Sequence, residues 1–406
     1  ALGRLRAMTS SDQHTALESS ASATGPLSGF RVIELAAIGP GPFAGQMLAD
    51  MGADVILVDR PGYHLPFVEK RGKRSIVIDL RKEEGAALVL DLVRTADAVI
   101  EGYRPGVAER LGVGPAACHG VNPALVYGRM TGWGQTGPWA RVAGHDINYL
   151  SITGALGALG PADRPPPVPL NLMGDYGGGS MFLLSGLLAA MLRAQKTGKG
   201  DIVDAAIIDG VSAMMGVILS LEAVGQWQPD RGQNMLDGGA PYYRCYETAD
   251  GRYMAVGAIE PQFFALLLAT LDLDADDFGG QNDRARWPAQ HRRLEEIFQS
   301  HDQNHWSALF DGADACVTPV LTYDQAAVHP HNKARASHVS SAPINAGVRC
   351  QPAAAPRFSG SPSDRQNIAP TIAAKGSHTH DILSALSYSD EKIEALLKHA
   401  VIQAAS

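Results

Sequence analysis

The chain has 406 residues, 45% hydrophobic and 19% charged, which is typical of a soluble globular protein long enough for two domains. Its net charge of -8, with no dense basic segment and no apolar run of membrane-spanning length, disfavours nucleic-acid binding and a membrane span. The four cysteines are widely spaced and form no C-x-x-C pair, so we expect neither a zinc site nor disulfides, and a reducing location such as the cytoplasm.

The first half of the chain begins with a strand–helix–strand pattern. Residues 1–24 are polar and lack a continuous apolar core, so we expect a disordered leader and no secretory signal. Residues 30–35 predict a strand, the glycines and prolines at 39–42 predict a loop, 45–51 predict a helix, and 54–58 a second strand. These elements form a βαβ unit.

The same alternation continues and predicts a parallel, Rossmann-like sheet in a large α/β domain at residues 25–200. A linker strand and helix would follow at 201–241. Further strands are expected at 75–80, 98–100, 125–130 and 202–205, and helices at 83–94, 179–193 and 209–224.

A change in composition after residue 241 marks a smaller α/β domain at residues 242–333. Here 242–258 predicts a hairpin around Ala249-Asp-Gly251. Amphipathic patterns predict helices at 261–271, 288–298 and 305–310, and one more at 390–399. The polar, Pro-rich remainder, residues 334–406, is expected to wrap back on the large domain.

Three glycines, Gly39, Gly41 and Gly45, lie between the first strand and helix and imitate a dinucleotide-binding loop. Two prolines remove amide donors from this loop, and Arg60 beside Asp59 suits a phosphate better than a ribose diol. A tight turn without any ligand explains the glycines equally well. If a ligand binds, a phosphorylated adenosine such as that of coenzyme A fits better than NAD.

Many longer motifs occur in one order between residue 25 and about residue 330. They are Ile38-Gly-Pro-Gly-Pro42, Asp59-Arg-Pro61, Gly72-Lys-Arg-Ser75, Tyr103-Arg-Pro-Gly106, Gly132-Trp-Gly-Gln-Thr-Gly-Pro138, Gly144-His-Asp-Ile-Asn-Tyr149, Gly174-Asp175, Asn234-Met-Leu-Asp-Gly-Gly-Ala-Pro241, Val256-Gly-Ala-Ile-Glu-Pro261 and Asp314-Ala-Cys-Val-Thr-Pro319. By these motifs the chain resembles the α-methylacyl-CoA racemases of the family III CoA-transferase superfamily.

The resemblance implies an isomerase that inverts the α-carbon of 2-methyl-branched acyl-CoA thioesters, with coenzyme A as part of the substrate and no metal, NAD, flavin or PLP. It also implies an intertwined homodimer whose active site joins the large domain of one subunit to the small domain of the other. The implied catalytic groups are His145, Asp175, Glu260 paired with His145, and the main chain near Asp146 as donor to the thioester oxygen.

The resemblance further assigns residues that hold the substrate. It places Arg60, Lys73, Arg74 and Arg104 at the nucleotide phosphates. We also expect Tyr149, Gly177 and Tyr243 to line the substrate pocket.

The chemistry explains why these residue types are suitable. Inversion next to a thioester needs one group to remove the α-proton, a second on the opposite face to return one, and donors for the enolate. His145 starts from a pKa of about 6.5, and a carboxylate such as Glu260 would fix its tautomer. Asp175 starts from about 3.9, so an apolar pocket or a neighbouring charge must raise its pKa. The glycines after Asp175 would let a bulky thioester approach the main chain.

Simpler interpretations remain open at each position. His145 and the arginines could be surface residues, Glu260 could cap the helix that Pro261 begins, and Asp175 could be an N-cap. A family III CoA-transferase would use Asp175 as a nucleophile but has no evident use for His145 or Glu260. A non-catalytic acyl-CoA carrier would need none of the acid/base groups.

Overall fold

The structure is a computed structural model that describes residues 25–62, 68–340, 350–360 and 372–405. The expected leader at 1–24 lies outside these residues. The chain divides into two compact units. Unit 1 comprises the described residues of Ala1–Asp146, Asn171–Gly210 and His331–Ser406, and unit 2 comprises Ile147–Leu170 and Val211–Pro330. The second unit is therefore larger than the predicted domain at 242–333.

Unit 1 contains a seven-stranded sheet in the order β12-β3-β2-β1-β4-β5-β6. All neighbouring strands are parallel except β12, which runs antiparallel to β3. This order confirms the predicted α/β class with a Rossmann-like sheet. The strands are β1 (Arg31–Leu35), β2 (Asp54–Asp59), β3 (Arg74–Ile78), β4 (Ala98–Glu101), β5 (Val126–Thr131), β6 (Asp201–Ala206) and β12 (Ile402–Gln403).

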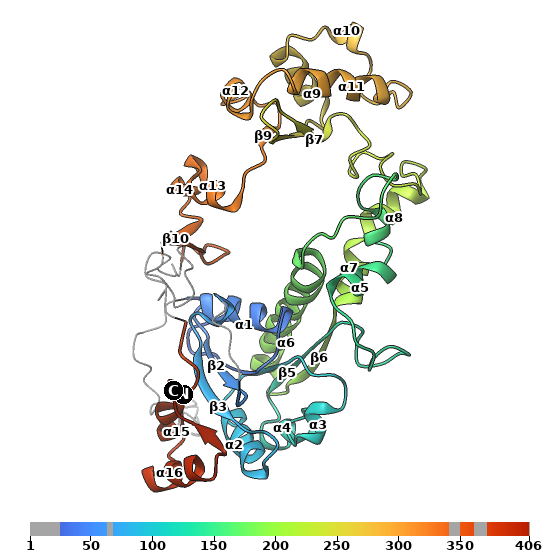
Figure 1. Cartoon of the computed structure of the whole chain (residues 1–406). Coiled ribbons are helices and arrows are strands. Elements are labelled where there is room, and N and C mark those ends of the chain that lie inside the picture. The colour runs from blue at the N-terminus through green and yellow to red at the C-terminus, as the bar shows by residue number, and fades with distance from the viewer. Residues whose placement is uncertain (1–24, 63–67, 341–349, 361–371, 406) are drawn as a thin grey trace, which may run out of the picture. The chain divides into compact units, whose positions relative to one another are not determined.

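Helices lie on both faces of this sheet (Figure 1), so strands β1 to β5 are buried on both sides, whereas much of the edge strand β6 is exposed. Ile33 and Leu35 of β1 join the core formed with α2, whereas Glu34 points to the opposite face, where α1 packs. The helices of the first part of the unit are α1 (Pro40–Asp50), α2 (Glu83–Val93), α3 (Val107–Arg110), α4 (Pro115–Val121), α6 (Met181–Thr197) and the single turn η1 (Val68–Lys70).

Three helices of the first half differ from the sequence expectation. The predicted loop at 39–42 is the first turn of α1, because Pro40 occupies a first-turn position where its missing N–H costs nothing. The predicted helix at 179–193 is preceded by a π-helix, η3 (Leu172–Ser180). The long helix expected at 209–224 is two helices, α7 (Ile207–Met214) and α8 (Gly216–Ala223), and Gly216, a weak helix former, begins the second.

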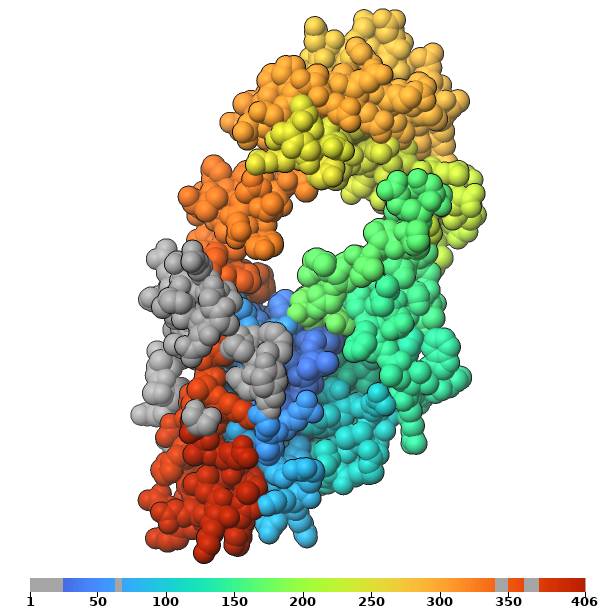
Figure 2. Space-filling model, viewed as in Figure 1, coloured from blue at the N-terminus to red at the C-terminus, as the bar shows by residue number. Residues whose placement is uncertain are grey.

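The C-terminal residues pack against β3 and α2, as the red and light-blue atoms in Figure 2 show. Strand β12 pairs with β3, and the Tyr388 hydroxyl donates to Asp91 of α2 at 2.7 Å. Arg71 is fully buried and donates to both oxygens of Asp50 and to the carbonyl of Pro352. The elements of this region are α14 (Pro330–Ala334), β10 (His338–Ser340), β11 (Cys350–Pro352), α15 (Thr379–Ala385) and α16 (Asp390–Lys398).

Unit 2 has its own core around a three-stranded antiparallel sheet, β7-β8-β9. The predicted hairpin is β7 (Tyr243–Glu247) paired with β8 (Tyr253–Gly257), and β9 (Val317–Pro319) adds an edge that the sequence did not indicate. Aromatic rings such as Phe298 and Trp306 fill the core. The remaining elements are α5 (Asp146–Ile152), whose first residue belongs to unit 1, η2 (Leu156–Ala158), α9 (Pro261–Thr270), α10 (Ala275–Phe278), α11 (Trp287–Phe298), α12 (Gln303–Leu309) and α13 (Tyr323–Val328).

One continuous helical stretch among the described residues, Leu172–Thr197, is long and apolar enough to cross a membrane by length and composition. Its second part, α6, lies on β5 and β6 as a helix covering the sheet. Leu183, Leu187 and Met191 are buried there. A helix that covers the sheet of an α/β domain can have the same length and apolar composition as a membrane-spanning helix.

Candidate functional site

In an open α/β sheet, ligands bind at the carboxyl ends of the strands, at the point where the strand order reverses. In this sheet that point is at β1, because β2 and β3 lie on one side of it and β4 and β5 on the other. Strand β1 lies between β2 and β4. Gly39 follows β1, Arg60 follows β2, and Arg104 comes shortly after β4, so two of the four predicted phosphate ligands flank the loop that begins α1. Both arginines are exposed, and Arg60 is close enough to Tyr103 to act on its pKa.

Asp175 lies in the middle of the π-helix η3 and is not the N-cap of α6. A Cβ placed on Gly39 would stand 3.3 Å from the Asp175 carboxylate, so that carboxylate lies against the loop between β1 and α1. The Ser180 hydroxyl donates to the carbonyl of Pro40 at 2.8 Å and so connects η3 to the same loop. Stretches of π-helix are rare and occur often at functional sites.

The pKa of Asp175 is raised to about 6, as a second acid/base group requires. Burial of the carboxyl is the largest cause, and the nearby carboxylate of Asp146 is the second. His145 opposes the shift, so its imidazole is within electrostatic range of Asp175. The structure therefore brings together two of the predicted catalytic residues, although His145 is itself exposed.

Asp146 is the first residue of α5, and amides in the first turn of a helix have no acceptor within that helix. Its side chain is 8% exposed, and its Oδ2 accepts the main-chain N–H of Asp175 at 2.7 Å. The resemblance assigned a function only to the main chain at Asp146. The contact of its carboxylate with Asp175 is a finding of the structure.

Two of the predicted phosphate ligands are engaged by carboxylates. Lys73 is 4% exposed, and its Nζ donates to Glu34 at 2.6 Å and to the carbonyl of Pro42 at 2.8 Å. Burial lowers the pKa of Lys73 and raises that of Glu34. Arg74 makes a two-pronged ion pair with Asp54. These positions differ from the exposed charge that a phosphate ligand needs, and they favour a structural function for both residues.

A different lysine, which the sequence motifs did not indicate, lies near Arg60. The ammonium group of Lys375 donates to the carbonyl of Gly62. Burial lowers the pKa of Lys375, and the nearby positive charges of Lys70 and Arg60 lower it further. Lys70 also pairs with Asp59 at 3.1 Å. Because Lys375 is more than 300 positions from Arg60, only folding of the C-terminal segment onto the sheet could reveal this basic cluster, defined as Arg60, Lys70 and Lys375.

Asp59 is the residue that a dinucleotide site would use for the ribose diol. Its carboxylate is 6% exposed and already accepts from the Ser75 hydroxyl at 2.8 Å and from Lys70. Both oxygens are thus engaged inside the protein. This arrangement favours the phosphate interpretation of the Arg60 region over an NAD site.

Three polar residues around Asp175 were not singled out from the sequence. The Tyr176 hydroxyl donates to Glu69 at 2.6 Å, and the Asn171 side chain is hydrogen-bonded to both Asp175 and Tyr176. Glu69 also contributes a negative charge near Asp175. Asn171 and Tyr176 adjoin the Gly174-Asp175 motif, whereas Glu69 is about 100 positions away and carried no local signal.

The glycines after Asp175 allow close packing within unit 1. A Cβ on Gly179 would meet Pro40 and Ile207 at 3.1 Å, and a Cβ on Gly210 would stand 1.9 Å from the carbonyl oxygen of Gly178. Gly177, expected in the substrate pocket, is half-buried. These contacts show that small residues are required where η3 meets α1 and α7.

The other predicted site residues lie in unit 2. Glu260 is the N-cap residue of α9, but its side chain makes no capping hydrogen bond, so its carboxylate is not used to close the helix. Tyr149 on α5 is 9% exposed, and Tyr243 begins β7 and is partly exposed. The predicted pairing of Glu260 with His145 joins residues of different units and stays a prediction.

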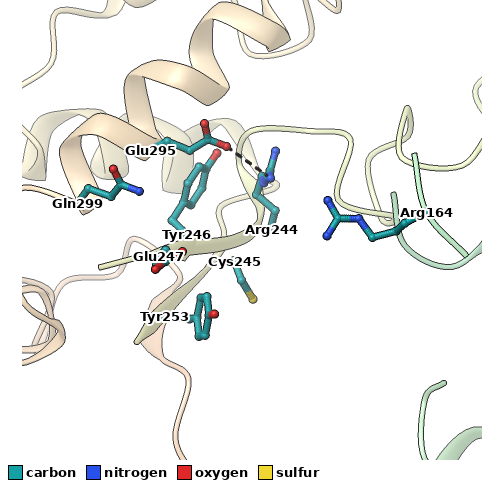
Figure 3. Close-up of a pocket in the computed structure, with 8 residues that line it drawn as sticks. All are labelled: Arg164, Arg244, Cys245, Tyr246, Glu247, Tyr253, Glu295 and Gln299. Atoms are coloured by element: carbon teal, nitrogen blue, oxygen red, sulfur yellow. Dashed lines mark ion pairs between the residues drawn. The ribbon is translucent and has the colours of Figure 1, made fainter. Parts of the chain in front are cut away.

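Unit 2 also contains a cavity of about 380 Å³ beside β7 and α11 (Figure 3). Arg164 and Arg244 face it together with Glu247 and Glu295, and Arg244 pairs with Glu295 at 3.6 Å. Its opposing charges indicate no particular ligand. Across the described residues, no group of three or more His, Cys, Asp or Glu side chains is arranged to hold a metal ion.

Comparison with known proteins gives a consistent result. Residues 27–379 match the family described as CoA-transferase family III. The chain is 39% identical to mouse alpha-methylacyl-CoA racemase over 93% of its length and 97% of the relative, and 40% identical to the human protein with the same coverage. It is 32% identical to succinyl-CoA–D-citramalate CoA-transferase of Chloroflexus aurantiacus over 92% of its length and 97% of the relative. The crystal structure of a CAIB/BAIF family protein from Brucella suis superposes with a TM-score of 0.76 at 27% identity, covering 89% of this chain and all of that one.

Proposed function

Since this chain belongs to CoA-transferase family III, we propose that it is an isomerase that inverts the α-carbon of 2-methyl-branched acyl-CoA thioesters. The observation that carries the proposal is the pairing of two acid/base groups, His145 and Asp175, within electrostatic range, with the pKa of Asp175 raised to about 6. The Asp175 carboxyl can then gain and lose a proton near neutrality. The two mammalian relatives named alpha-methylacyl-CoA racemase support this function over others in the family.

The reaction is a proton transfer at one carbon. One of the two groups removes the α-proton, the electron pair moves onto the thioester oxygen to form an enolate, and the other group delivers a proton to the opposite face. A main-chain N–H at the start of α5 would donate to the enolate oxygen. Neither a bond to sulfur nor an oxidation state changes, so no second substrate is consumed.

Coenzyme A would be held at the carboxyl edge of the sheet. Arg60 and Arg104 supply exposed guanidinium groups there, and Lys70 and Lys375 extend the positive charge around Arg60. The overall charge of -8 makes such a local concentration necessary for binding phosphates. Lys73 and Arg74 would act indirectly by fixing the strands that carry this loop.

We further infer a homodimer in which Glu260 reaches His145 and orients its imidazole, with Tyr149 and Tyr243 beside the acyl chain. The sequence of α8, Gly-Val-Ile-Leu-Ser-Leu-Glu-Ala, is apolar, yet the helix has no buried residue within the chain. Helices that are apolar on all sides are normally covered. We propose that a second copy of the chain packs against α8.

The free state of all four cysteines is compatible with a reducing compartment such as the cytoplasm.

The decisive experiment is proton NMR in deuterated water with one pure epimer of a 2-methylacyl-CoA. We expect loss of the α-hydrogen signal together with appearance of the other epimer, without any added acceptor acid. The competing function is CoA transfer with Asp175 as nucleophile, which the identity to the Chloroflexus transferase supports. Formation of a new CoA ester only when a free carboxylic acid is added, with no α-hydrogen exchange, would favour the transferase instead.

A further inference from the structure

The carboxylate of Asp146 is a buried charge that the proposed reaction does not yet use. We propose that Asp146 is a positioning residue, whose carboxylate holds the main chain of Asp175 and keeps a negative charge beside the Asp175 side chain. The inference rests on the proposed function, because it assigns Asp146 the task of setting the pH range in which Asp175 exchanges protons.

The geometry supports the holding function. Oδ2 of Asp146 accepts the N–H of Asp175 at 2.7 Å, and the N–H of Gly174 also bonds to this carboxylate. A Cβ on Gly174 would stand 2.4 Å from Oδ2, which is too close for any side chain. Only glycine at position 174 lets the carboxylate approach the main chain this closely. The carboxylate thus connects the start of α5 to the π-helix that carries Asp175.

The other oxygen of this carboxylate is in an unusual environment. Oδ1 of Asp146 is buried and has no hydrogen-bond partner among the described residues. Burial raises the pKa of Asp146, while the two N–H donors oppose that shift. A buried carboxylate that is only half satisfied is costly, and such groups call for a functional explanation. The effect of this carboxylate on the pKa of Asp175 is such an explanation.

The titratable groups around Asp175 come from three segments. Asp146 begins α5 and His145 directly precedes it, Glu69 lies in η1, and the Tyr176 hydroxyl comes from η3 itself. The first turns of α1 and α6, which pack on η3, carry no acidic residue. Strands β5 and β6 also contact η3. Their charged residues have other partners: Arg129 of β5 pairs with Glu101 and Glu109, and Asp204 of β6 accepts the N–H of Gln135.

Among these groups Asp146 has the largest charge effect on Asp175 and acts to raise its pKa, while His145 lowers it. Inversion needs a group that can accept the α-proton, so activity falls at low pH as Asp175 becomes protonated. Without the charge of Asp146 the pKa of Asp175 falls, and the acid limb of the activity profile moves to lower pH.

The test is the pH profile of kcat/KM for inversion of each pure epimer, measured with the whole protein in the wild type and in Asp146→Asn. The amide of Asn keeps an oxygen acceptor for the N–H of Asp175 but removes the charge. We expect an acid limb near pH 6 in the wild type and one lower by roughly one pH unit in the variant, for both epimers. Asp146→Ser, which also keeps an acceptor without a charge, should move the limb in the same direction and serves if the Asn variant is unstable.

The matched control is Asp390→Asn, which removes a charge from an aspartate that is 80% exposed on α16 and should leave the profile unmoved. A uniform loss of activity in Asp146→Asn, with the acid limb unchanged, would overturn the inference and leave Asp146 a purely structural residue. Absence of inversion and of α-hydrogen exchange in the wild type is a different result. It would reject the proposed racemase itself, and the inference with it.

Discussion

Among single residues, Asp175 shows most directly how the fold changes the chemistry of a side chain. An aspartate in water is ionised at neutral pH and is a poor proton donor. Burial in η3 and the proximity of Asp146 raise its pKa to about 6, near the ordinary value of histidine. The proposed function requires such a carboxyl, because it would act as the acid in one direction of the reaction and as the base in the other.

We predict that His145→Ala and Asp175→Asn each reduce inversion by roughly 10²- to 10⁴-fold, because each variant loses one of the two proton-transferring groups. The remaining group should still exchange the α-hydrogen of the epimer that faces it. Exchange into deuterated water should therefore persist for one epimer in His145→Ala and for the other in Asp175→Asn. Equal loss of exchange from both epimers in both variants, at every pH tested, would argue against two faces.

Replacing Arg60 by Ala should weaken binding of coenzyme A itself, measured by calorimetry, by roughly 10-fold, the loss of one charge-assisted contact to a phosphate. Affinity of the wild type should fall with added salt, and the variant should show a smaller salt dependence. Arg94→Ala, which removes an exposed arginine directly after α2, is the control. Unchanged affinity in Arg60→Ala would place this arginine outside the binding site.

At the scale of elements, one buried ion pair connects β1, α1 and β3. Lys73 precedes β3, Glu34 lies on β1, and Pro42, whose carbonyl accepts from Lys73, lies in the first turn of α1. A Cβ on Gly45 would stand 1.8 Å from Glu34, so glycine is required where the helix passes this pair. The pair thus fixes the start of α1, which forms one wall of the proposed site.

Lys73→Met should destabilise the protein by about 3–5 kcal/mol, because it leaves the Glu34 carboxylate buried without its partner. The double variant Glu34→Leu with Lys73→Met should recover most of this loss, since both charges are then removed. Urea unfolding of the three proteins measures the effect. A single variant within about 1 kcal/mol of the wild type would show that Lys73 is not held in the interior.

The π-helix η3 packs so closely on α7 that Gly210→Ala should force its main chain to move. The new Cβ would stand 1.9 Å from the carbonyl of Gly178, three residues after Asp175. We expect a loss of about 1–3 kcal/mol in stability and a fall in inversion rate of at least about 10-fold. Gly120→Ala on α4 is the matched control, because a Cβ there meets no atom within 4 Å. Equal behaviour of the two variants would contradict the close packing.

At the scale of the whole molecule, the apolar surface of α8 predicts self-association. Val217 is 59% exposed and Leu219 57% exposed, although both are large apolar residues. Sedimentation velocity should give twice the chain mass of 42.9 kDa for the wild type. Val217→Glu or Leu219→Glu should shift the protein toward the monomer, because a charge would be buried at the contact. Leu397→Glu on α16 is the control, and a monomeric wild type would contradict the dimer.

Much of the fold follows from local patterns in the sequence. Apolar strands alternate with helices, as residues 30–35 and 45–51 do, and each of these patterns depends only on residues that are near one another in the chain. Each strand of the sheet from β1 to β6 was therefore predicted. The boundaries were less predictable where local signals conflict. Pro40 looked like part of a loop, yet a proline at a first helical position needs no acceptor for an N–H, and α1 begins there.

The sequence by itself also determined the family, because motifs such as those around His145 and Asp175 are local strings of residues. Only the tertiary structure decided what those residues touch. It placed Lys73 in a buried pair, added Lys375 to the Arg60 cluster, and brought the carboxylate of Asp146 to the main chain of Asp175. The physical reason is that burial and charge proximity arise from residues far apart in the chain, which no local pattern records.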